Sequence, residues 1–172
     1  RDRYVIILSG DQICKQDYAD FLRFHKEKGA EFSVAVMEVD WKEASRFGLM
    51  VADETDRITE FQEKPPVPKS NLASMGIYIF NWDVLKKYLI EDEADPNSKN
   101  DFGMNIIPAL LRDGRKMYAY HFNGYWRDVG TIDSLWEANM EVLDPENSGI
   151  DIFDEKWKIY SRNPVLPAQK IG

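Results

Sequence analysis

The chain has 172 residues, of which 44% are hydrophobic and 13% aromatic, with a formal net charge of −8. This length fits one domain with a sizeable core, and the acidic balance argues against a nucleic-acid surface, which needs clustered Lys and Arg. Cys14 is the single cysteine, so neither an internal disulfide nor a cysteine-based metal cage is expected, and a cytoplasmic location is compatible with this. No apolar run approaches the roughly 20 residues of a membrane helix.

The first half of the chain alternates between strand and helix patterns. Residues 4–8 are a continuous β-prone apolar run, typical of a strand buried on both faces. Asp17 can cap a helix that Gly29 ends, and residues 32–39 predict the next strand. This strand–helix–strand order predicts a right-handed parallel unit. Residues 47–52 and 57–61 follow as a predicted hairpin with a short polar loop.

The second half continues the alternation after a proline-rich segment. Further elements are a strand at 73–80, a helix from 82 to about 90 capped by Asn81, a helix at 103–111 with Pro108 near a kink or an end, a strand at 116–122, and a helix capped by Thr131 that runs to about 143. Ile132, Leu135, Trp136 and Met140 lie on one face of this last helix. The fold class is therefore α/β with a mixed sheet.

Three groups of residues could carry chemistry. Asp11 stands just past the carboxyl end of a buried strand, where ligands collect in open α/β sheets; a turn or cap role is equally compatible. Glu63 and Lys64 precede Pro65, which biases Lys64 toward an extended backbone. A lysine suits a phosphate, although an exposed Glu–Lys ion pair is the commoner fate of such neighbours. Asp128 precedes a glycine turn and could hold Mg²⁺ together with Asp11, or instead pair with Arg127 or cap the following helix.

Two further features have simpler interpretations. Gly76, in the Ser74-Met75-Gly76 stretch of a strand, marks a close approach by a ligand or another backbone, or else simple packing. His25 lies at a core-facing helical position and is expected to be packed, and His121 has no evident partner. The sequence has no nucleophile elbow, Walker loop or His-containing triad.

The order of these motifs is more specific than any one of them. The chain carries, in sequence, Ser-Gly-Asp (9–11), Phe-Gly-Leu-Met (47–50), Phe-Gln-Glu-Lys-Pro (61–65), Leu-Ala-Ser-Met-Gly-Ile-Tyr (72–78), Asn-Asp-Phe-Gly (100–103) and Tyr-Trp-Arg-Asp-Val-Gly-Thr (125–131). Over nearly its whole length it resembles glucose-1-phosphate adenylyltransferases. The Ser-Gly-Asp and Glu-Lys-Pro motifs are shared with other sugar nucleotidyltransferases.

The resemblance implies a GT-A-like, Rossmann-type nucleotidyltransferase sheet, mixed but mostly parallel, with flanking helices. It implies ATP and glucose 1-phosphate as substrates, ADP-glucose and pyrophosphate as products, and a homotetramer that binds neither nucleic acid nor membrane. Lys64 would hold the sugar phosphate, with Glu63, Ser74 and the Gly48 backbone near the sugar and Trp126 shaping its pocket. Asp11 and Asp128 would hold Mg²⁺, and Asp11, Lys64 and Asp128 would be the catalytic residues.

The resemblance also implies that parts of the family pattern lie outside this chain. Residues 1–160 match part of the catalytic domain, and residues 161–172 resemble the start of a linker toward a C-terminal left-handed β-helix. The glycine-rich basic loop that grips ATP is expected upstream, so we expect this chain alone to be inactive. A non-catalytic paralogue, or an enzyme using another base or sugar, stays open.

Overall fold

The computed structural model describes residues 3–14 and 17–142 of the chain. In chain order its elements are β1 (Tyr4–Leu8), β2 (Gln12–Cys14), α1 (Tyr18–Glu27), β3 (Phe32–Glu38), the 3₁₀ turn η1 (Ala44–Arg46), β4 (Gly48–Ala52), β5 (Ile58–Glu63), β6 (Leu72–Asn81), α2 (Trp82–Glu93), the π-helical turn η2 (Phe102–Ile106), α3 (Ile107–Arg112), β7 (Met117–His121), β8 (Trp126–Asp128) and α4 (Ile132–Val142). The predicted strands and helices are confirmed to within a few residues. The expectation that the strand at residues 4–8 is buried on both faces is wrong for the described residues, because Ile6 and Leu8 are exposed. The linker predicted at 161–172 lies outside the described residues.

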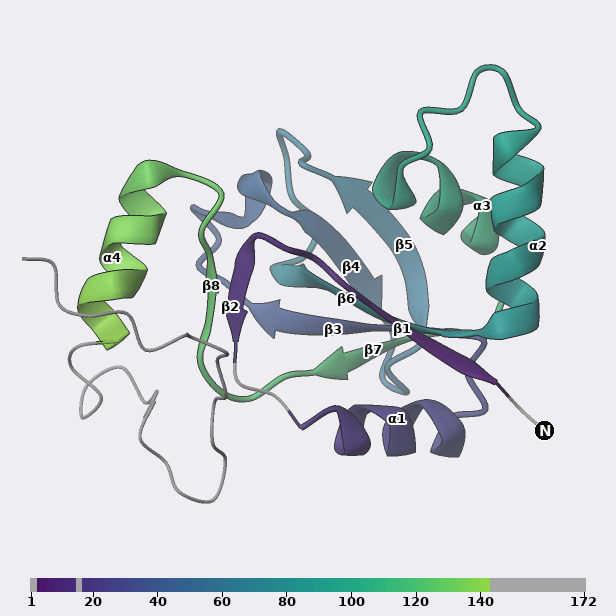
Figure 1. Cartoon of the computed structure of the whole chain (residues 1–172), viewed down its shortest axis with the longest axis horizontal. Helices are drawn as coiled ribbons and strands as arrows, with labels where there is room; N and C mark the ends of the chain where they lie inside the picture. Colours follow the sequence, from purple (N-terminus) through teal and green to yellow (C-terminus); the bar gives the residue numbers. More distant parts are fainter. Residues whose placement is uncertain (1–2, 15–16, 143–172) are drawn as a thin grey trace, which may run out of the picture.

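The main sheet is mixed, with β6 at its centre (Figure 1). The strand order is β5-β4-β6-β3-β7, and β1 also pairs with β6. Because β1 and β3 are both antiparallel to β6, they run in the same direction, as the strand–helix–strand pattern predicted. The expectation of mostly parallel pairing is wrong for the described residues: only β3 and β7 pair in parallel, since β6 inserts between β1 and β3 and the β4–β5 hairpin is antiparallel. A separate two-stranded sheet joins β2 to β8.

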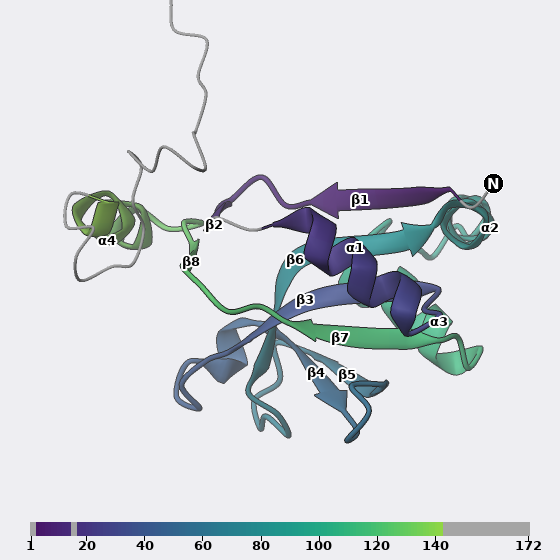
Figure 2. The same cartoon turned by 90° about the horizontal axis from the view of Figure 1, so that it is seen from below.

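Helices cover both faces of this sheet, as the views in Figures 1 and 2 show. Alternate residues of β3 point to opposite faces, as the period of a strand requires. Phe32 and Val34 join a core with residues of α2 and α3, whereas Ala35 packs in a second core with Phe21 of α1. This three-layer arrangement confirms the α/β class. None of the described helices is long and apolar enough to cross a bilayer.

Helix ends follow the predicted caps with one exception. The Asp17 side chain accepts a hydrogen bond from the Ala19 amide, and Gly29 has a φ of +59° just after α1. Thr131 Oγ1 accepts from the Ser134 amide at the start of α4. Asn81 occupies the cap position of α2, but its side chain makes no capping bond there.

Asn81 contributes instead to a buried histidine network. His25 is fully buried, and its ring nitrogens lie 2.8 Å from both Ser33 Oγ and Asn81 Oδ1. The packed histidine predicted from the sequence is therefore confirmed. The expectation that His121 has no partner is wrong, because its Nε2 lies 3.1 Å from Asp56 Oδ1 at the tip of the β4–β5 hairpin.

Two helical predictions need refinement. The helix predicted at 103–111 is divided into η2 and α3, with Pro108 in the first turn of α3, where a missing amide hydrogen is tolerated. In α4 the predicted apolar face exists but is not covered by the described part of the chain. Its exposed side chains are Ile132, Leu135, Trp136 and Met140.

Candidate functional site

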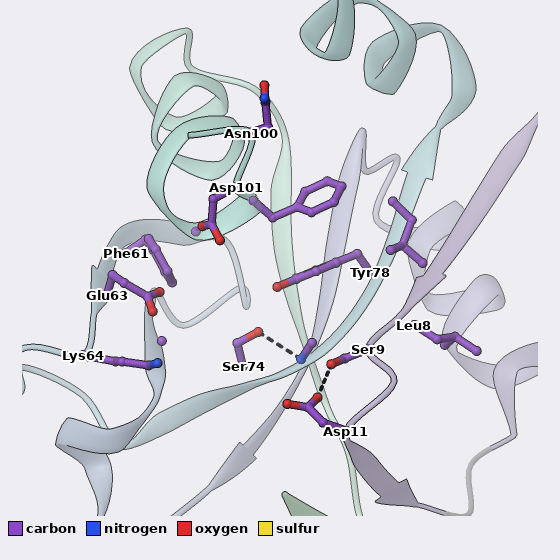
Figure 3. A pocket seen from close by; sticks show the side chains of 15 residues that line it. Leu8, Ser9, Asp11, Phe61, Glu63, Lys64, Ser74, Tyr78, Asn100 and Asp101 are labelled. Atoms are coloured by element: carbon purple, nitrogen blue, oxygen red, sulfur yellow. Dashed lines mark hydrogen bonds between the residues drawn. The ribbon is translucent and has the colours of Figure 1, made fainter. Parts of the chain in front are cut away.

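A pocket of about 500 Å³ opens where β1, β4, β5 and β6 meet the η2 turn. Figure 3 shows its side chains arriving from both sides of β6: Asp11 from one side, and Glu63 and Lys64 from the other. Ser74 lies between them on β6. Gly48 also lines this pocket. Five of the seven site residues predicted from the sequence therefore line one cavity: Asp11, Gly48, Glu63, Lys64 and Ser74.

The small β2–β8 sheet begins directly beside the pocket and brings Asp128 close to Asp11, although Asp128 itself does not line the pocket. β2 starts directly after Asp11, and Gln12 pairs with Asp128. The Val129 amide donates to the Asp11 carbonyl at 2.9 Å, which fixes the two segments together. A Cβ added at Gly130 would lie 3.2 Å from Asp128 Oδ1 and 3.7 Å from Asp11 Oδ2. The two predicted carboxylates thus flank the same glycine, although they are 117 positions apart in the chain.

The interactions of these two carboxylates differ from the simple alternatives raised by the sequence. Asp128 Oδ1 accepts from the Gly130 amide at 3.0 Å. Arg127, its neighbour in sequence, pairs instead with Glu141 of α4 at 2.8 Å. Asp11 Oδ1 accepts from the Ser9 hydroxyl, so its bonding is local. In each carboxylate the second oxygen, Oδ2, accepts no hydrogen bond from the described residues.

The basic side of the pocket is the open end of the β4–β5 hairpin. Gly48 pairs with Glu63 in the antiparallel register, and the Lys64 amide donates to the Phe47 carbonyl at 3.2 Å. Lys64 has a φ of +42°, so the extended backbone expected before Pro65 is wrong. The chain bends here as it leaves β5, directly after the last hydrogen bond between the two strands of the hairpin. Neither Glu63 nor Lys64 takes part in an ion pair among the described residues, so the simple surface pair is not what forms.

The floor of the pocket is an irregular stretch of β6. Gly76 has a φ of +68°, and its amide donates to Ser74 Oγ at 3.2 Å. The register with β3 shifts opposite this stretch, and the Gly76 carbonyl accepts from the Ser9 amide at 3.0 Å. The predicted close approach at Gly76 is thus made by the segment that leads to Asp11, which places the β1 end over the pocket floor.

Trp126 does not line this pocket. It is buried in the core beneath the sheet, with its ring centroid 5.5 Å from that of Phe47. Phe47 precedes Gly48, so Trp126 supports the hairpin from behind. It also borders a separate hollow between the end of β3 and α4, which Asp128 shares.

Comparison with known proteins gives a family for this arrangement. The family model described as nucleotidyl transferase matches residues 1–145. The chain belongs to the nucleotidyl transferase family. It is 65% identical to a glucose-1-phosphate adenylyltransferase of Clostridium beijerinckii and 63% identical to that of Clostridium acetobutylicum, over 98% of this chain. It is 58% identical to that of Desulforamulus reducens over 100% of the chain. The chain spans about 44% of the length of the Clostridium relatives.

The pocket of this nucleotidyl transferase has a third wall that sequence reasoning missed. Residues 100–103 carried the resemblance, but no site role was assigned to them. Asp101 caps η2, because its Oδ1 accepts from the Met104 amide at 2.8 Å. Phe102 stacks on Tyr78 with ring centroids 5.4 Å apart, and Gly103 lies against Glu63. The sequence signal was the Asp-Phe-Gly motif itself, directly after the polar loop 94–100.

The surroundings of the Glu63 carboxylate raise its pKa. Partial burial raises the pKa of Glu63; the nearby Lys64 ammonium lowers it, and Asp101 raises it again. Burial also raises the pKa of Tyr78, which packs beneath them. The pocket thus combines one ammonium group with carboxylates from three elements, a set suited to a ligand that has both a phosphate and hydroxyl groups.

The donors beside Gly130 fit a divalent cation in part. Mg²⁺ is usually held by one or two carboxylates together with substrate phosphates and water. Asp11 and Asp128 supply two carboxylates beside Gly130, although of these two only Asp11 lines the pocket. In the described residues no cluster of three or more His, Cys, Asp or Glu side chains could hold a metal. A cation at this place would therefore depend on substrate oxygens for its remaining ligands.

Proposed function

We propose that this chain is the central part of a glucose-1-phosphate adenylyltransferase, which makes ADP-glucose and pyrophosphate from ATP and glucose 1-phosphate. The observation that carries the proposal is the convergence of Asp11, Glu63 and Lys64 on one pocket, with Asp128 beside Asp11. The similarity to proteins of that name over 98% of the chain supports the choice of substrates. The full-length protein is a protein of those relatives' length that contains this chain.

The proposed roles follow from position and charge. Lys64 binds the phosphate of glucose 1-phosphate, since its ammonium points into the pocket (Figure 3) and makes no ion pair in the described residues. Glu63 and Ser74 contact the sugar hydroxyls, and the Gly48 backbone lies against the sugar. Trp126 acts from behind by holding Phe47, and with it the hairpin end, in place.

The reaction needs little acid–base chemistry. An oxygen of the sugar phosphate attacks the α-phosphorus of ATP, a new P–O bond forms, and the bond to the pyrophosphate oxygen breaks. The nucleophile is already ionised near neutral pH, so positioning and charge neutralisation supply most of the rate enhancement. Asp11 and Asp128 would hold Mg²⁺, which would neutralise charge on the phosphates when bound.

The remaining proposals concern the whole protein. Residues 1–160 would belong to the catalytic domain and residues 161–172 to a linker toward a left-handed β-helix. The full-length protein would be a cytoplasmic homotetramer serving glycogen or starch synthesis.

The test is direct synthesis. Full-length protein incubated with ATP, glucose 1-phosphate and Mg²⁺ should release pyrophosphate and ADP-glucose in equal amounts, measured by chromatography. Parallel reactions with other nucleoside triphosphates and other sugar 1-phosphates distinguish an enzyme of different specificity, which would turn over one of those pairs faster. No product from any pair would instead support the non-catalytic paralogue and overturn the proposal.

A further inference from the structure

The Glu63 carboxylate occupies space that is free only because Gly48 and Gly103 have no side chains. A Cβ built on Gly103 would lie 2.7 Å from Glu63 Oε2, closer than real Cβ atoms approach a neighbour. A Cβ built on Gly48 would lie 3.1 Å from the same oxygen. One glycine comes from β4 and the other from η2, so the carboxylate sits in a notch between two elements that are far apart in sequence.

The backbone on the η2 side of this notch is held firmly. Before Gly103, Asp101 caps the turn and Phe102 stacks on Tyr78. After it, the Ile106 amide donates to the Asp101 carbonyl at 3.3 Å, across five residues, and Ile106 is buried in the core. Wide turns of this kind occur often at functional sites.

A side chain at position 103 would therefore displace the Glu63 carboxylate and leave the η2 turn in place. Glu63 Oε2 is the far end of a flexible side chain. The φ of Gly103 is not in the left-handed region, so alanine is compatible with the backbone there. A second hollow, bordered by Lys99, Asn105 and Pro108, adjoins the pocket beyond Glu63 and Gly103 and can receive a displaced carboxylate.

We propose that Gly103 is a positioning residue for glucose 1-phosphate: its missing side chain keeps the Glu63 carboxylate in the sugar pocket beside Lys64. This inference rests on the proposed function, because it assigns Gly103 a role in binding the same substrate. It gives a reason for the wide π-helical turn in the third wall of the pocket. The turn brings a bare backbone against a charged side chain that accepts no hydrogen bond from the described residues.

The experiment is a double-mutant cycle in the full-length protein, with Gly103→Ala, Glu63→Ala and the double variant. Gly103→Ala should raise the KM for glucose 1-phosphate about tenfold, the lower range expected when a charge-assisted hydrogen bond is lost. It should leave kcat and the KM for ATP within about twofold of wild type. In the Glu63→Ala background the same substitution should change the KM for glucose 1-phosphate by less than about twofold, because the displaced group is gone.

Met104→Ala is the matched control, since Met104 is the next residue of the same turn and is half exposed; it should behave as wild type. Effects of Gly103→Ala that add in full to those of Glu63→Ala would overturn the inference, as would an unchanged KM for glucose 1-phosphate. An equal rise in both KM values with a loss of kcat would indicate general damage to the fold and would also overturn it. A wild-type protein that makes no ADP-glucose would instead refute the proposed function on which the inference rests.

Discussion

Charged side chains at the two ends of the sheet differ in how completely they are hydrogen-bonded. Near the start of β3, Glu31 accepts from Arg115 Nη1 and from the Lys116 amide, both at 2.9 Å. Arg115 Nε donates to the Tyr88 hydroxyl, which donates to Asp113. The charged groups of Glu31, Arg115 and Asp113 therefore each have a hydrogen-bond partner.

In the pocket at the other end, the polar groups are gathered but incompletely paired. Among the described residues, the Glu63 carboxylate and the Lys64 ammonium make no hydrogen bond or ion pair, although both line the same cavity. A closed network contributes to stability, whereas groups held together without partners are available to a ligand. The comparison therefore predicts that substitutions at one end change stability and those at the other change binding and rate.

The largest effect is expected from Asp128→Asn in the full-length protein. Asparagine can still accept from the Gly130 amide, so the turn should survive, but one of two carboxylates beside Gly130 loses its charge. We expect kcat to fall about 100-fold or more, with a higher Mg²⁺ requirement, because charge neutralisation by a metal supplies several kcal/mol. Steady-state rates across a Mg²⁺ titration check this. Asp133→Asn, an exposed acid in the next helix, is the control; equal rates for both variants would remove Asp128 from the metal site.

The buried network of His25 gives the converse case. His25→Ala removes two hydrogen bonds at 2.8 Å and leaves a cavity next to Ser33 and Asn81. The free energy of unfolding should fall by about 2–4 kcal/mol, while both KM values stay unchanged at a temperature where the variant is folded. Urea-induced unfolding measures the first and initial rates the second. Glu27→Ala, at an exposed position of the same helix, is the control and should change neither the free energy of unfolding nor the KM values. A selective change in one KM would mean that the two ends of the sheet are coupled.

Lys64→Ala should have the opposite result: substrate binding weakens while stability stays the same. Loss of one charge-assisted phosphate contact costs about 1.5–3 kcal/mol, which is about a 10- to 100-fold rise in the KM for glucose 1-phosphate. The KM for ATP and the unfolding midpoint should change little, because the ammonium makes no ion pair in the described residues. Lys69→Ala, which breaks only an exposed pair with Glu60, is the control. If the KM for ATP rises as much as that for glucose 1-phosphate, Lys64 does not belong to the sugar phosphate alone.

Local patterns predicted the elements but not how they pair. Asp17 and Gly29 determine the ends of α1 through interactions within a few residues, and so they could be read directly. The position of β6 between β1 and β3 depends on pairs of residues that lie 34 to 77 positions apart in the chain. The mostly parallel sheet implied by the resemblance is wrong for that reason.

The site shows the same limit. Asp11 and Lys64 could be predicted as residues of one site because each belongs to a short recognisable motif. Gly103 could not, since its role depends on the close approach of Glu63, 40 positions earlier. The prediction for the φ of Lys64 is wrong for a related reason. The local preference imposed by Pro65 is weaker than the hydrogen bond that ties the Lys64 amide to Phe47, 17 positions earlier.

The smallest expected effect is a pH dependence that comes from Glu63. Burial raises the pKa of its carboxyl and Asp101 adds to this, partly offset by Lys64. If the ionised form accepts hydrogen bonds from sugar hydroxyls, the KM for glucose 1-phosphate should rise as the pH falls toward that raised pKa, above the ordinary value of 4.5. Glu63→Gln should abolish the part of this dependence that comes from Glu63, because an amide does not titrate in this range.

The phosphate of glucose 1-phosphate also titrates in mildly acidic solution, so the KM of wild type alone cannot isolate Glu63. The ratio of the two KM values, Glu63→Gln over wild type, removes the contribution of the substrate, because both proteins meet the same ionic form. This ratio should fall toward one as the pH decreases, since wild-type Glu63 becomes neutral like glutamine. A ratio that stays constant with pH would mean that the charge of Glu63 does not contribute to binding, and the unpaired carboxylate in the pocket would then need another explanation.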